Sequence, residues 1–398
     1  MLRGRNLLFI RDTFLLGVTA FGGPQAHIAM MLQLFVRRRK YLSEEELMEA
    51  LAFCSMLPGP TSTQTLITIA LKRGGASLAW IALAVWALPA ALFMTALTLA
   101  FTYYEAKGFS LDFLVFVQPM AIGFILFAAF KIGRTVIKNE VGVFLMLLSL
   151  AITVFLNAPW VFPVMLFVCG MITNFSNRKI LPPLSNRPGV NWRVSSLNLG
   201  LLILLLIGAA VVGAITHHRS AILFENFLRF GSITFGGGGV LVPMMFEQFV
   251  KHRAYLTANE FISGYALNQA VPGPAFAFAT FSGGMALKEF GLNYQILGCL
   301  LGTIGIFMPG ALMVFFIYPL WQYLKSYRFI QRSLEGINAA ATGMVLGAAM
   351  ILYSNLEFQM VNLFVIASTF CLLQFTKIPS PLLVLLGLIA GFAFRHFA

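Results

Sequence analysis

The sequence has little charge: of its 398 residues only 10% are Asp, Glu, Lys or Arg, whereas 59% are hydrophobic. A soluble domain carries about 25% charged residues. The few charges of this sequence could not cover the surface of a hydrophobic core of this size. The sequence also lacks a GxxxxGK[ST] phosphate-binding loop, a cluster with metal-ligand spacing and a catalytic triad. These absences exclude a soluble globular protein and argue against an ATP-driven pump or an enzyme. No cofactor is expected.

Cysteine is scarce as well. The four cysteines are Cys54, Cys169, Cys299 and Cys371, and all of them lie within apolar runs. We interpret them as small apolar residues of the core or of the lipid-facing surface. They do not indicate a redox compartment.

Long apolar runs take the place of the missing charge. Ile81–Phe101, Leu197–Ile215 and Pro381–Phe397 are each long enough, or nearly so, for a helix that crosses a bilayer core of about 30 Å. The runs are continuous, whereas a membrane barrel needs alternating segments of about ten residues. The first run, Leu7–Val36, is too long for a secretory signal, and we interpret it as uncleaved. The sequence therefore predicts an all-α integral membrane protein, a polytopic helical bundle.

The formal net charge of +13 resides mainly in short polar segments between these runs. Anionic lipid headgroups and the positive-inside rule explain such charges without nucleic acid, so no nucleic-acid partner is expected. The second interpretation is a field that attracts anionic substrates.

The chain contains two copies of one unit. Phe21-Gly22-Gly23 recurs as Phe235-Gly236-Gly237, and Pro58-Gly59-Pro60 recurs as Pro272-Gly273-Pro274, at one offset of 214 residues (235 − 21 and 272 − 58). The same register holds for further pairs, which are Gly17 and Gly231, Arg39 and Arg253, Tyr41 and Tyr255, and Glu46 and Glu260. After a short insertion in the second copy, Pro89 corresponds to Pro309.

This repeat predicts three parts: a first transporter repeat over residues 1–176, a cytoplasmic loop with an extra transmembrane helix over 177–220, and a second repeat over 221–398. In the first repeat we expect the broken segments 7–36 and 47–71 and helices near 76–104, 113–137, 141–156 and 159–174. In the second we expect the broken segments 222–250 and 260–287 and helices near 292–323, 329–354, 358–376 and 380–397.

The extra helix, Leu197–Ile215, has a topological consequence. Each copy crosses the membrane an even number of times, so one odd helix between them turns the second copy upside down. The expected architecture is an inverted-topology repeat with its site near the bilayer midplane. The Arg and Lys residues around 3–11, 37–40, 72–73 and 178–193 place one side in the cytoplasm. They also favour re-entrant broken segments over spanning ones, although Lys251 and Arg253 then lie outside, so both possibilities stay open.

Proline and glycine at membrane depth carry the chemical signal. Gly22-Gly23-Pro24 and Pro58-Gly59-Pro60 should each end one half-helix and start another, because Pro removes a backbone donor and Gly permits positive φ. A restarted helix presents free N–H groups and a positive dipole end, which together bind anions. The alternative is that the breaks are kinks that serve packing. Four breaks in paired register favour the binding site.

Polar residues flank these breaks, and they differ between the copies. Thr61, Ser62 and Thr63 follow the first Pro-Gly-Pro, where they either hydrogen-bond an oxyanion or only cap the helix, and Gln64 could add an amide donor. In the second copy the polar pair Asn268-Gln269 precedes Pro272-Gly273-Pro274 instead. The site should therefore be asymmetric. The four glycines Gly236, Gly237, Gly238 and Gly239 form either an anion-holding nest or a tight helix crossing.

Four charged residues and one histidine complete the candidate site. His27, one turn after Pro24, is either a proton-linked group or a structural histidine, and Gln25 between them is a further candidate for substrate binding. Glu46 and Glu260 either stabilise a first helical turn or form gates with Arg39 and Arg253. Arg39 and its neighbours are alternatively contacts for lipid headgroups.

These motifs resemble those of the chromate ion transporter family, of the two-domain, long-chain type. Phe21-Gly22-Gly23-Pro24 with Ala26-His27, then Leu57-Pro58-Gly59-Pro60, is similar to its first half, and Gln269-Ala270-Val271-Pro272-Gly273-Pro274 is similar to its second half. The resemblance implies an inner-membrane carrier of bacterial type with thirteen crossings. It also implies efflux of chromate, coupled to protons, as a resistance mechanism, with sulfate as the similar competing dianion.

Our first hypothesis is therefore a secondary transporter that exports chromate or a related oxyanion, an antiport with protons, from the cell across the inner membrane. The alternative is an importer or exchanger of sulfate or another small anion on the same scaffold. A channel would conduct faster and independently of a proton gradient, and a membrane enzyme or scaffold would give no flux. The sequence leaves open whether two copies pair as a homodimer.

Overall fold

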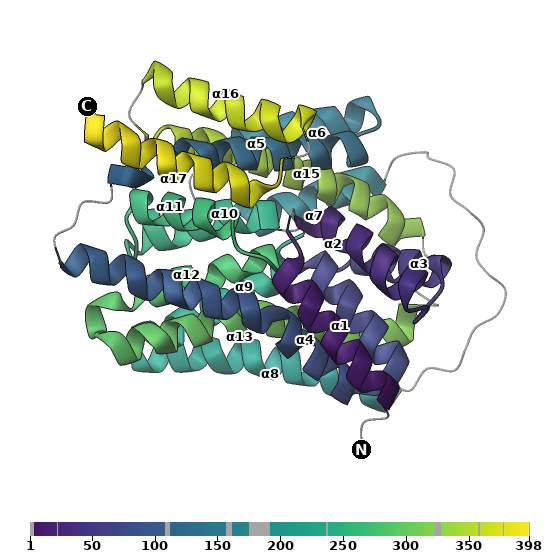
Figure 1. Cartoon of the computed structure of the whole chain (residues 1–398). Helices are drawn as coiled ribbons and strands as arrows, with labels where there is room; N and C mark the ends of the chain where they lie inside the picture. Colours follow the sequence, from purple (N-terminus) through teal and green to yellow (C-terminus); the bar gives the residue numbers. More distant parts are fainter. Residues whose placement is uncertain are drawn as a thin grey trace. The chain divides into compact units, whose positions relative to one another are not determined.

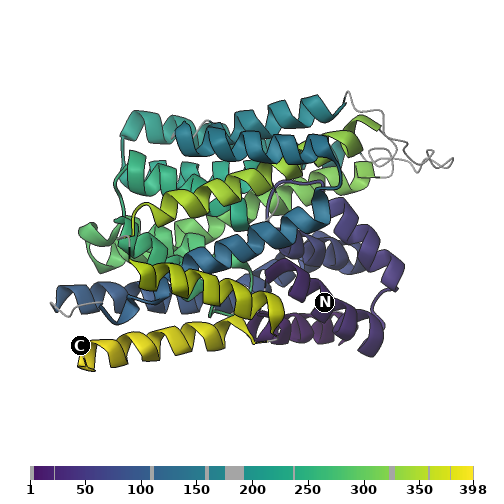
Figure 2. The ribbon, with the colours of Figure 1, turned by 90° about the horizontal axis from the view of Figure 1, so that it is seen from above.

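The computed structural model of the chain describes residues 4–21, 23–107, 112–156, 161–174, 192–235, 238–321, 328–356, 359–376 and 378–397. Within these residues every regular element is a helix and no strand is present, as both views of the ribbon show (Figure 1, Figure 2). The expected all-helical fold is confirmed.

The helices follow one another along the chain in the order of the two repeats. The first repeat contains α1 (Gly4–Thr19), α2 (Gly23–Met31), η1 (Leu32–Arg38), α3 (Glu44–Cys54), α4 (Thr61–Ala106), η2 (Asp112–Leu114), α5 (Val117–Val136), α6 (Glu140–Phe155) and α7 (Val161–Asn174). The extra helix is α8 (Trp192–Thr216). The second repeat contains α9 (Arg219–Ile233), α10 (Gly238–Phe246), η3 (Glu247–His252), α11 (Ala258–Asn268), η4 (Ala275–Ala277), α12 (Phe278–Ala286), η5 (Lys288–Phe290), α13 (Leu292–Ile317), η6 (Tyr318–Leu320), α15 (Arg328–Tyr353), α16 (Met360–Phe375) and α17 (Ser380–Phe397).

The expected helices after the broken segments are confirmed, with boundaries that differ by a few residues. The second half of segment 47–71 and the helix expected near 76–104 both lie within α4, but Gly74 and Gly75 leave the helical conformation between them, so the expected separation is confirmed. Gly75 has φ of +74°, which a residue with a Cβ rarely adopts. α4 is therefore two helices joined at a glycine kink.

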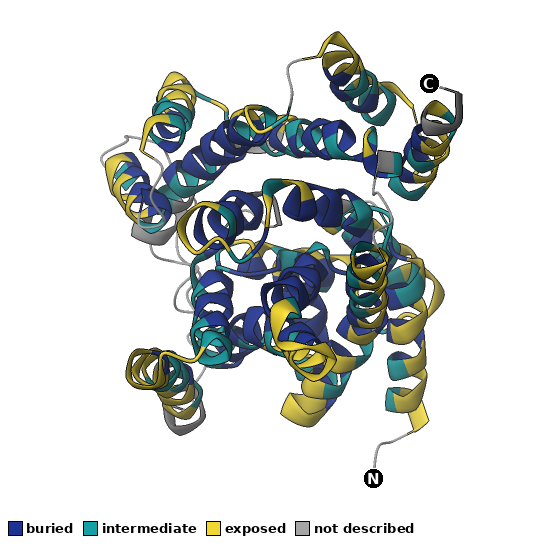
Figure 3. Ribbon diagram, turned by 90° about the vertical axis from the view of Figure 1, so that its left-hand side faces the viewer, coloured by how far each residue is buried: buried dark blue, intermediate teal, exposed yellow. Residues whose placement is uncertain are grey.

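Several helices have the length and composition needed to cross a membrane. Among the described residues five such candidates are Thr61–Ala106, Val117–Arg134, Ser196–Thr216, Leu292–Leu320 and Glu335–Tyr353. Large apolar side chains lie open on several helices, such as Ile215 on α8 and Phe364 on α16, 75% and 73% exposed. Figure 3 shows helices that are buried along one side and exposed along the other. Such apolar exposure fits a lipid environment, and the chain is a multi-pass membrane protein.

The chain forms two compact units that do not follow the two repeats. Unit 1 consists of Met1–Thr102, Arg187–Thr234 and Val271–Gln322, and unit 2 consists of Tyr103–Asn186, Phe235–Ala270 and Tyr323–Ala398. Each unit therefore combines segments of both copies. The sequence repeat does not predict this combination of segments, because it depends on long-range packing.

Unit 1 is built around helices in close contact. α13 packs against α9, α12 and α8. Close approach depends on glycine: a Cβ at Gly283 would lie 2.2 Å from the carbonyl oxygen of Gly298, and a Cβ at Gly302 would lie 2.2 Å from that of Ala279. Small residues at membrane-helix crossings let backbones meet in this way.

Unit 2 is organised on α15. This helix packs against α5, α6, α7 and α10, while α16 and α11 pack on α5. Gly336 and Gly343 of α15 approach the carbonyl oxygens of Cys169 and Met146 too closely for any side chain. Asn139, at the start of α6, donates a hydrogen bond to Glu335 of α15.

The two repeats also share local backbone features that the sequence register anticipates. Ser43 and Glu46 form a capping box at the start of α3, and Thr257 and Glu260 form the same box at the start of α11. The π-helical segments η1 and η3 end before a residue of positive φ, Lys40 (51°) in one copy and Ala254 (50°) in the other. The duplication is thus visible in the backbone as well as in the sequence.

Candidate functional site

All four predicted helix breaks are present. α1 ends at Thr19 before α2 begins at Gly23, and α3 ends at Cys54 before α4 begins at Thr61. In the second copy, α9 ends at Ile233 before α10 begins at Gly238, and α11 ends at Asn268 before the turn η4. The expectation that these helices are interrupted is therefore confirmed.

The turns at the breaks depend on glycine. Gly59 and Gly273, the middle residues of the two Pro-Gly-Pro motifs, have φ of +118° and +109°. Gly23 begins α2 with φ of +77°. L-residues with a Cβ rarely adopt such values, which explains why glycine occupies these positions.

In unit 1 the breaks of the two copies exchange equivalent hydrogen bonds. The N–H of Gly59 donates to the carbonyl of Thr234 at 2.6 Å, and the N–H of Gly273 donates to the carbonyl of Ala20 at 2.8 Å. Gly273 and Thr234 are the repeat equivalents of Gly59 and Ala20 (273 − 59 and 234 − 20 both give 214). Reciprocal contacts of this kind are the signature of a two-fold relation.

Two close approaches follow the same relation. A Cβ at Gly17 would lie 3.1 Å from the carbonyl oxygen of Trp86, and a Cβ at Gly231 would lie 2.5 Å from that of Ile306. Gly17 and Gly231 are repeat equivalents, and both glycines also lie beside the proline that the repeat predicts, Pro89 or Pro309. The sequence repeat therefore has a structural counterpart within unit 1.

A buried polar network surrounds the start of α4. His27 Nδ1 lies 3.1 Å from Ser62 Oγ, and the imidazole ring contacts the Trp86 ring edge-on at 5.2 Å. Trp86 Nε1 donates to Thr63 Oγ1 at 3.0 Å. The network thus links α2, the first turn of α4 and the later part of α4.

Gln64 links the first Pro-Gly-Pro turn to the second copy. Its Nε2 donates to the Pro58 carbonyl at 2.7 Å and lies 3.4 Å from the Gly310 carbonyl of α13. The side chain is fully buried. Gln64 therefore holds the tip of the break in place.

Three of the buried polar side-chain atoms that have no hydrogen-bond partner among the described residues belong to the broken segments 7–36 and 47–71. They are Nε2 of His27, Oε1 of Gln64 and Oγ1 of Thr13. Buried polar atoms are normally paired, so such exceptions need an explanation such as water or a ligand. Two of the three belong to residues at the breaks.

Both broken segments of the first copy fold back on themselves. At the ends of the first, Arg39 Nε lies 2.8 Å from Asp12 Oδ2, and the Tyr41 hydroxyl donates to the same carboxylate at 2.7 Å. The Phe9 and Phe35 rings pack there in a tilted arrangement with their centroids 5.1 Å apart. At the ends of the second, Lys72 Nζ lies 2.5 Å from Glu46 Oε1.

Arg73 contacts residues at the closed ends of the first broken segment. Its guanidinium lies 4.3 Å from the centre of the Tyr41 ring and its Nη2 lies 3.4 Å from the Arg5 carbonyl. Both segments thus begin and end at one place, so each folds back as a hairpin. The predicted gate between Glu46 and Arg39 is not formed in this structure: Glu46 pairs with Lys72, and Arg39 pairs with Asp12.

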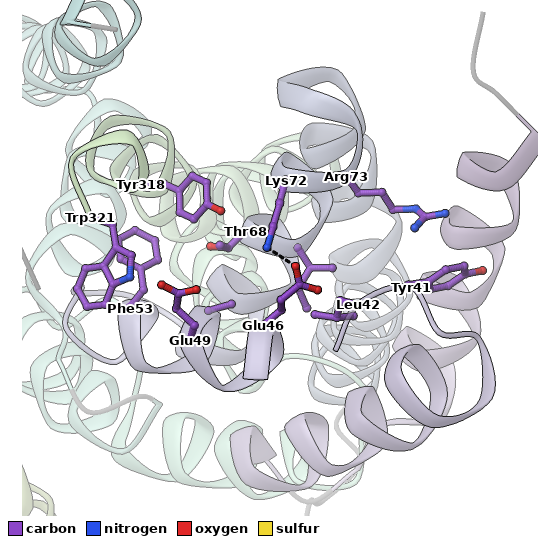
Figure 4. A pocket seen from close by; sticks show the side chains of 12 residues that line it. Tyr41, Leu42, Glu46, Glu49, Phe53, Thr68, Lys72, Arg73, Tyr318 and Trp321 are labelled. Atoms are coloured by element: carbon purple, nitrogen blue, oxygen red, sulfur yellow. Dashed lines mark hydrogen bonds and ion pairs between the residues drawn. The ribbon is translucent and has the colours of Figure 1, made fainter. Parts of the chain in front are cut away.

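A cavity of about 510 Å³ lies at this shared end, and we call it the vestibule. Its charged and aromatic lining includes Glu46, Glu49, Lys72, Arg73, Tyr318 and Trp321, all within unit 1 (Figure 4). Figure 4 shows the Lys72 ammonium meeting the Glu46 carboxylate, with Glu49 beside Trp321. The ammonium group of Lys72 holds the pKa of Glu46 below its usual value.

The remaining predicted residues lie elsewhere or outside the described structure. Gly22, Gly236 and Gly237 lie outside the described residues, and so does the side chain of Gln25. A further group belongs to unit 2, namely Gly238, Gly239, Arg253, Glu260, Asn268 and Gln269. Unit 1 contains Gly23, Pro24, His27, Pro58–Thr63 and Pro272–Pro274.

Sequence reasoning did not single out Asp12, Trp86 or Lys72. Asp12 carried a usable signal, because it is the only carboxylate in the run Leu7–Val36 and a charge within an apolar segment marks a partner or a function. Trp86 and Lys72 carried no local signal, since their importance arises from contacts with residues more than 20 positions away.

Comparison with known proteins gives a consistent result. A family model described as "Chromate transporter" matches residues 7–174 and 221–392, which are the two repeats without the intervening helix. The "Probable chromate transport protein" of Synechococcus elongatus is 25% identical over 95% of this chain and 93% of its own length.

The "Chromate transport protein" of Cupriavidus metallidurans is 24% identical over 99% of this chain and 94% of its own length. An uncharacterized transporter of Methanocaldococcus jannaschii is also 24% identical, over 95% of this chain and 91% of its own length. No solved structure matches the chain.

Proposed function

Because the chain belongs to the chromate transporter family, we propose that it is a secondary transporter that exports chromate or a related tetrahedral oxyanion. We further propose that protons drive this export across the inner (plasma) membrane. The anion would bind where the broken helices meet in unit 1, at the Gly23-Pro24 and Pro58–Thr63 breaks and beside Pro272–Pro274.

The observation that carries the proposal is the reciprocal pair of hydrogen bonds at the breaks. Gly59 with Thr234 and Gly273 with Ala20 hold interrupted helices of both copies against each other. Irregular backbone at membrane depth is tolerated only when it is buried in protein or lines a wet cavity. A two-fold relation between the copies also supports inverted repeats, in which alternating access exposes one site to either side.

The chemistry of the first break suits a tetrahedral dianion. α4 begins at Thr61, and the first N–H groups of a helix have no partner within it. These groups can therefore donate hydrogen bonds to the oxygens of an anion. Ser62 and Thr63 add hydroxyl groups, although each of these already contacts His27 or Trp86. Gln64 Oε1 cannot bind an anion directly, but a protonated oxyanion or a water could pair with it.

His27 supports the proposed coupling to protons. It is buried beside Ser62, and its Nε2 has no partner among the described residues. An imidazole in contact with a residue at the anion site can hold or release a proton as the anion binds or leaves. The second copy has Leu241 at the equivalent position, so this role would belong to the first half alone.

Uptake of radiolabelled chromate into inverted membrane vesicles tests the proposal. We expect saturable uptake that requires a pH gradient, with sulfate as a weaker competitor. Sulfate flux in the absence of chromate flux would show that sulfate, and not chromate, is the transported anion. Non-saturable flux that ignores the gradient would indicate a channel, and no flux of either anion would refute the transport proposal.

A further inference from the structure

The vestibule is separate from the proposed site at the helix breaks. Lys72 lies eleven residues after the start of α4 at Thr61, which corresponds to about 16 Å along the helix. The vestibule extends along α3 from Glu46 to Phe53, and the part of α4 before the Gly74–Gly75 kink, Tyr318 and Trp321 complete its lining. Its Lys72–Glu46 pair lies at the opposite end of the hairpin from the Pro58–Pro60 turn.

The Lys72–Glu46 pair at this cavity can open at little cost. The two side chains are 49% and 39% exposed, and ion pairs at such exposure contribute little to stability. Glu46 also accepts the N–H of Ser43 in the capping box, so its carboxylate keeps a partner when the ammonium leaves. Lys72 is thus a cation whose present counter-ion is replaceable by another anion.

A second donor lies on the wall of the vestibule. Trp321 is only 5% exposed, and its Nε1 has no hydrogen-bond partner among the described residues. An indole N–H only donates, so its natural partner is an acceptor oxygen. Arg73 adds a second positive charge to the lining, and Glu46 and Glu49 oppose it. This balance favours weak and reversible binding of an anion, which a site of passage requires.

Polar groups lead from the vestibule toward the tip. Lys72, Thr68 and Gln64 are spaced by four residues and lie on one face of α4. Thr68 lines the vestibule and donates from Oγ1 to the Gln64 carbonyl at 2.9 Å. Gln64 in turn donates to the Pro58 carbonyl at the tip.

We infer that the vestibule is an access site for the transported oxyanion, in which Lys72 exchanges the Glu46 carboxylate for the anion before it moves along α4 to the tip. This inference rests on the proposed function, which it deepens. The ligand class is a tetrahedral dianion, and Trp321 Nε1 is its second donor.

Thiol labelling within the cavity tests this inference without relying on transport. The four native cysteines are replaced, and Leu42→Cys places one thiol in the vestibule lining. Met48→Cys, on α3 but outside the lining and 51% exposed, is the matched control. The probe is sulfate, because chromate oxidises thiols, and potassium chloride of equal ionic strength controls for screening.

We expect sulfate, but not chloride, to slow labelling of Leu42→Cys by a negatively charged reagent at least threefold, and to leave Met48→Cys unchanged. Protection should disappear in Lys72→Gln and persist in Lys72→Arg. Glu46→Gln keeps the capping box, because glutamine also serves at that position. It should lower the sulfate concentration needed for protection about threefold, as expected for removal of one charge from a water-exposed site.

The outcomes separate the two proposals. Equal labelling rates in sulfate and chloride, in protein that still transports chromate, would overturn the vestibule inference and leave the transport function intact. Protection by sulfate in a protein that carries no oxyanion across the membrane would show an anion site at Lys72 but would overturn the transport function and, with it, the access role of the vestibule. Loss of protection in Lys72→Arg as well would also contradict the exchange at Lys72, provided that this variant elutes as a folded protein.

Discussion

Arg39 closes the first hairpin through the Asp12 carboxylate, with Nε 2.8 Å from Oδ2 and Nη2 3.1 Å from Oδ1. The two partners are unequally buried, since the Asp12 side chain is 1% exposed and that of Arg39 is 36% exposed. The Tyr41 hydroxyl donates to the same carboxylate. The pair therefore joins a buried charge on α1 to a half-exposed one beyond η1.

This inequality predicts an asymmetric effect of mutation. Arg39→Met leaves a buried carboxylate with less compensation and should lower stability by about 2–4 kcal/mol. Asp12→Asn leaves an arginine that can reach water, and its cost should be smaller, about 1–2 kcal/mol. Thermal unfolding of the purified variants in detergent measures both. Equal losses, or a larger loss in Asp12→Asn, would contradict this account of the closure.

The two glycines of the Pro-Gly-Pro turns should be equally intolerant of a side chain. At Gly59 and Gly273 the positive φ alone costs an alanine about 1–2 kcal/mol. A Cβ would also lie 2.8 Å from Gln64 Nε2 at the first position and 2.9 Å from Ala90 Cβ at the second. We expect Gly59→Ala and Gly273→Ala to reduce oxyanion flux at least tenfold.

Gly208→Ala is the matched control for this pair, because nothing lies within 4 Å of the position its Cβ would take on α8. It should keep full flux in the same vesicle assay. If one turn tolerates alanine and the other does not, the two breaks do not act as an equivalent pair.

His27 should control coupling more than binding. His27→Gln keeps a polar group next to Ser62 but cannot take up a proton at neutral pH. We expect this variant to exchange chromate for chromate across vesicles at nearly the normal rate and to lose the stimulation by a pH gradient. Stimulation that stays intact would exclude His27 from proton transfer.

The Glu46–Lys72 pair gives a prediction for acid pH. Lys72 lowers the pKa of Glu46, so the folded protein holds this carboxylate charged at pH values where a free glutamate takes up a proton. The stabilising contribution of the pair is therefore present above the usual pKa of about 4.3 and is lost as pH falls through the lowered value.

Labelling of the vestibule thiol in wild-type and Glu46→Gln backgrounds measures this effect. The ratio of rates for negatively and positively charged reagents should differ between the two above pH 5 and converge in acid. A difference that stays constant down to pH 3 would contradict the assignment of the charge to Glu46.

Much of the fold could be predicted from local sequence signals. The lengths of the hydrophobic runs predicted the helices. Gly23, Pro58–Pro60 and Pro272–Pro274 predicted the breaks, because glycine permits positive φ and proline lacks a backbone N–H donor. The register of 214 residues anticipated that Gly59 and Gly273 would have the same conformation.

The contacts between distant segments could not be predicted in this way. The pairing of Glu46 with Lys72 rather than with Arg39 depends on how two hairpins close. The contact of Trp86 with His27 and Thr63 depends on where α4 returns past its own first turn. The interleaving of the two copies within each compact unit is likewise a property of packing and not of any single segment.

The central claim is that the interrupted helices hold the oxyanion at their tips, and equilibrium binding of radiolabelled chromate to the purified protein tests it most directly. Pro60→Ala and Gly23→Val alter the two breaks of the first copy, and Gly208→Ala leaves the tips untouched. We expect wild type and Gly208→Ala to bind chromate in competition with sulfate, and both tip variants to reach the membrane folded but to bind at least tenfold more weakly. Unchanged chromate affinity in Pro60→Ala and Gly23→Val would contradict the claim.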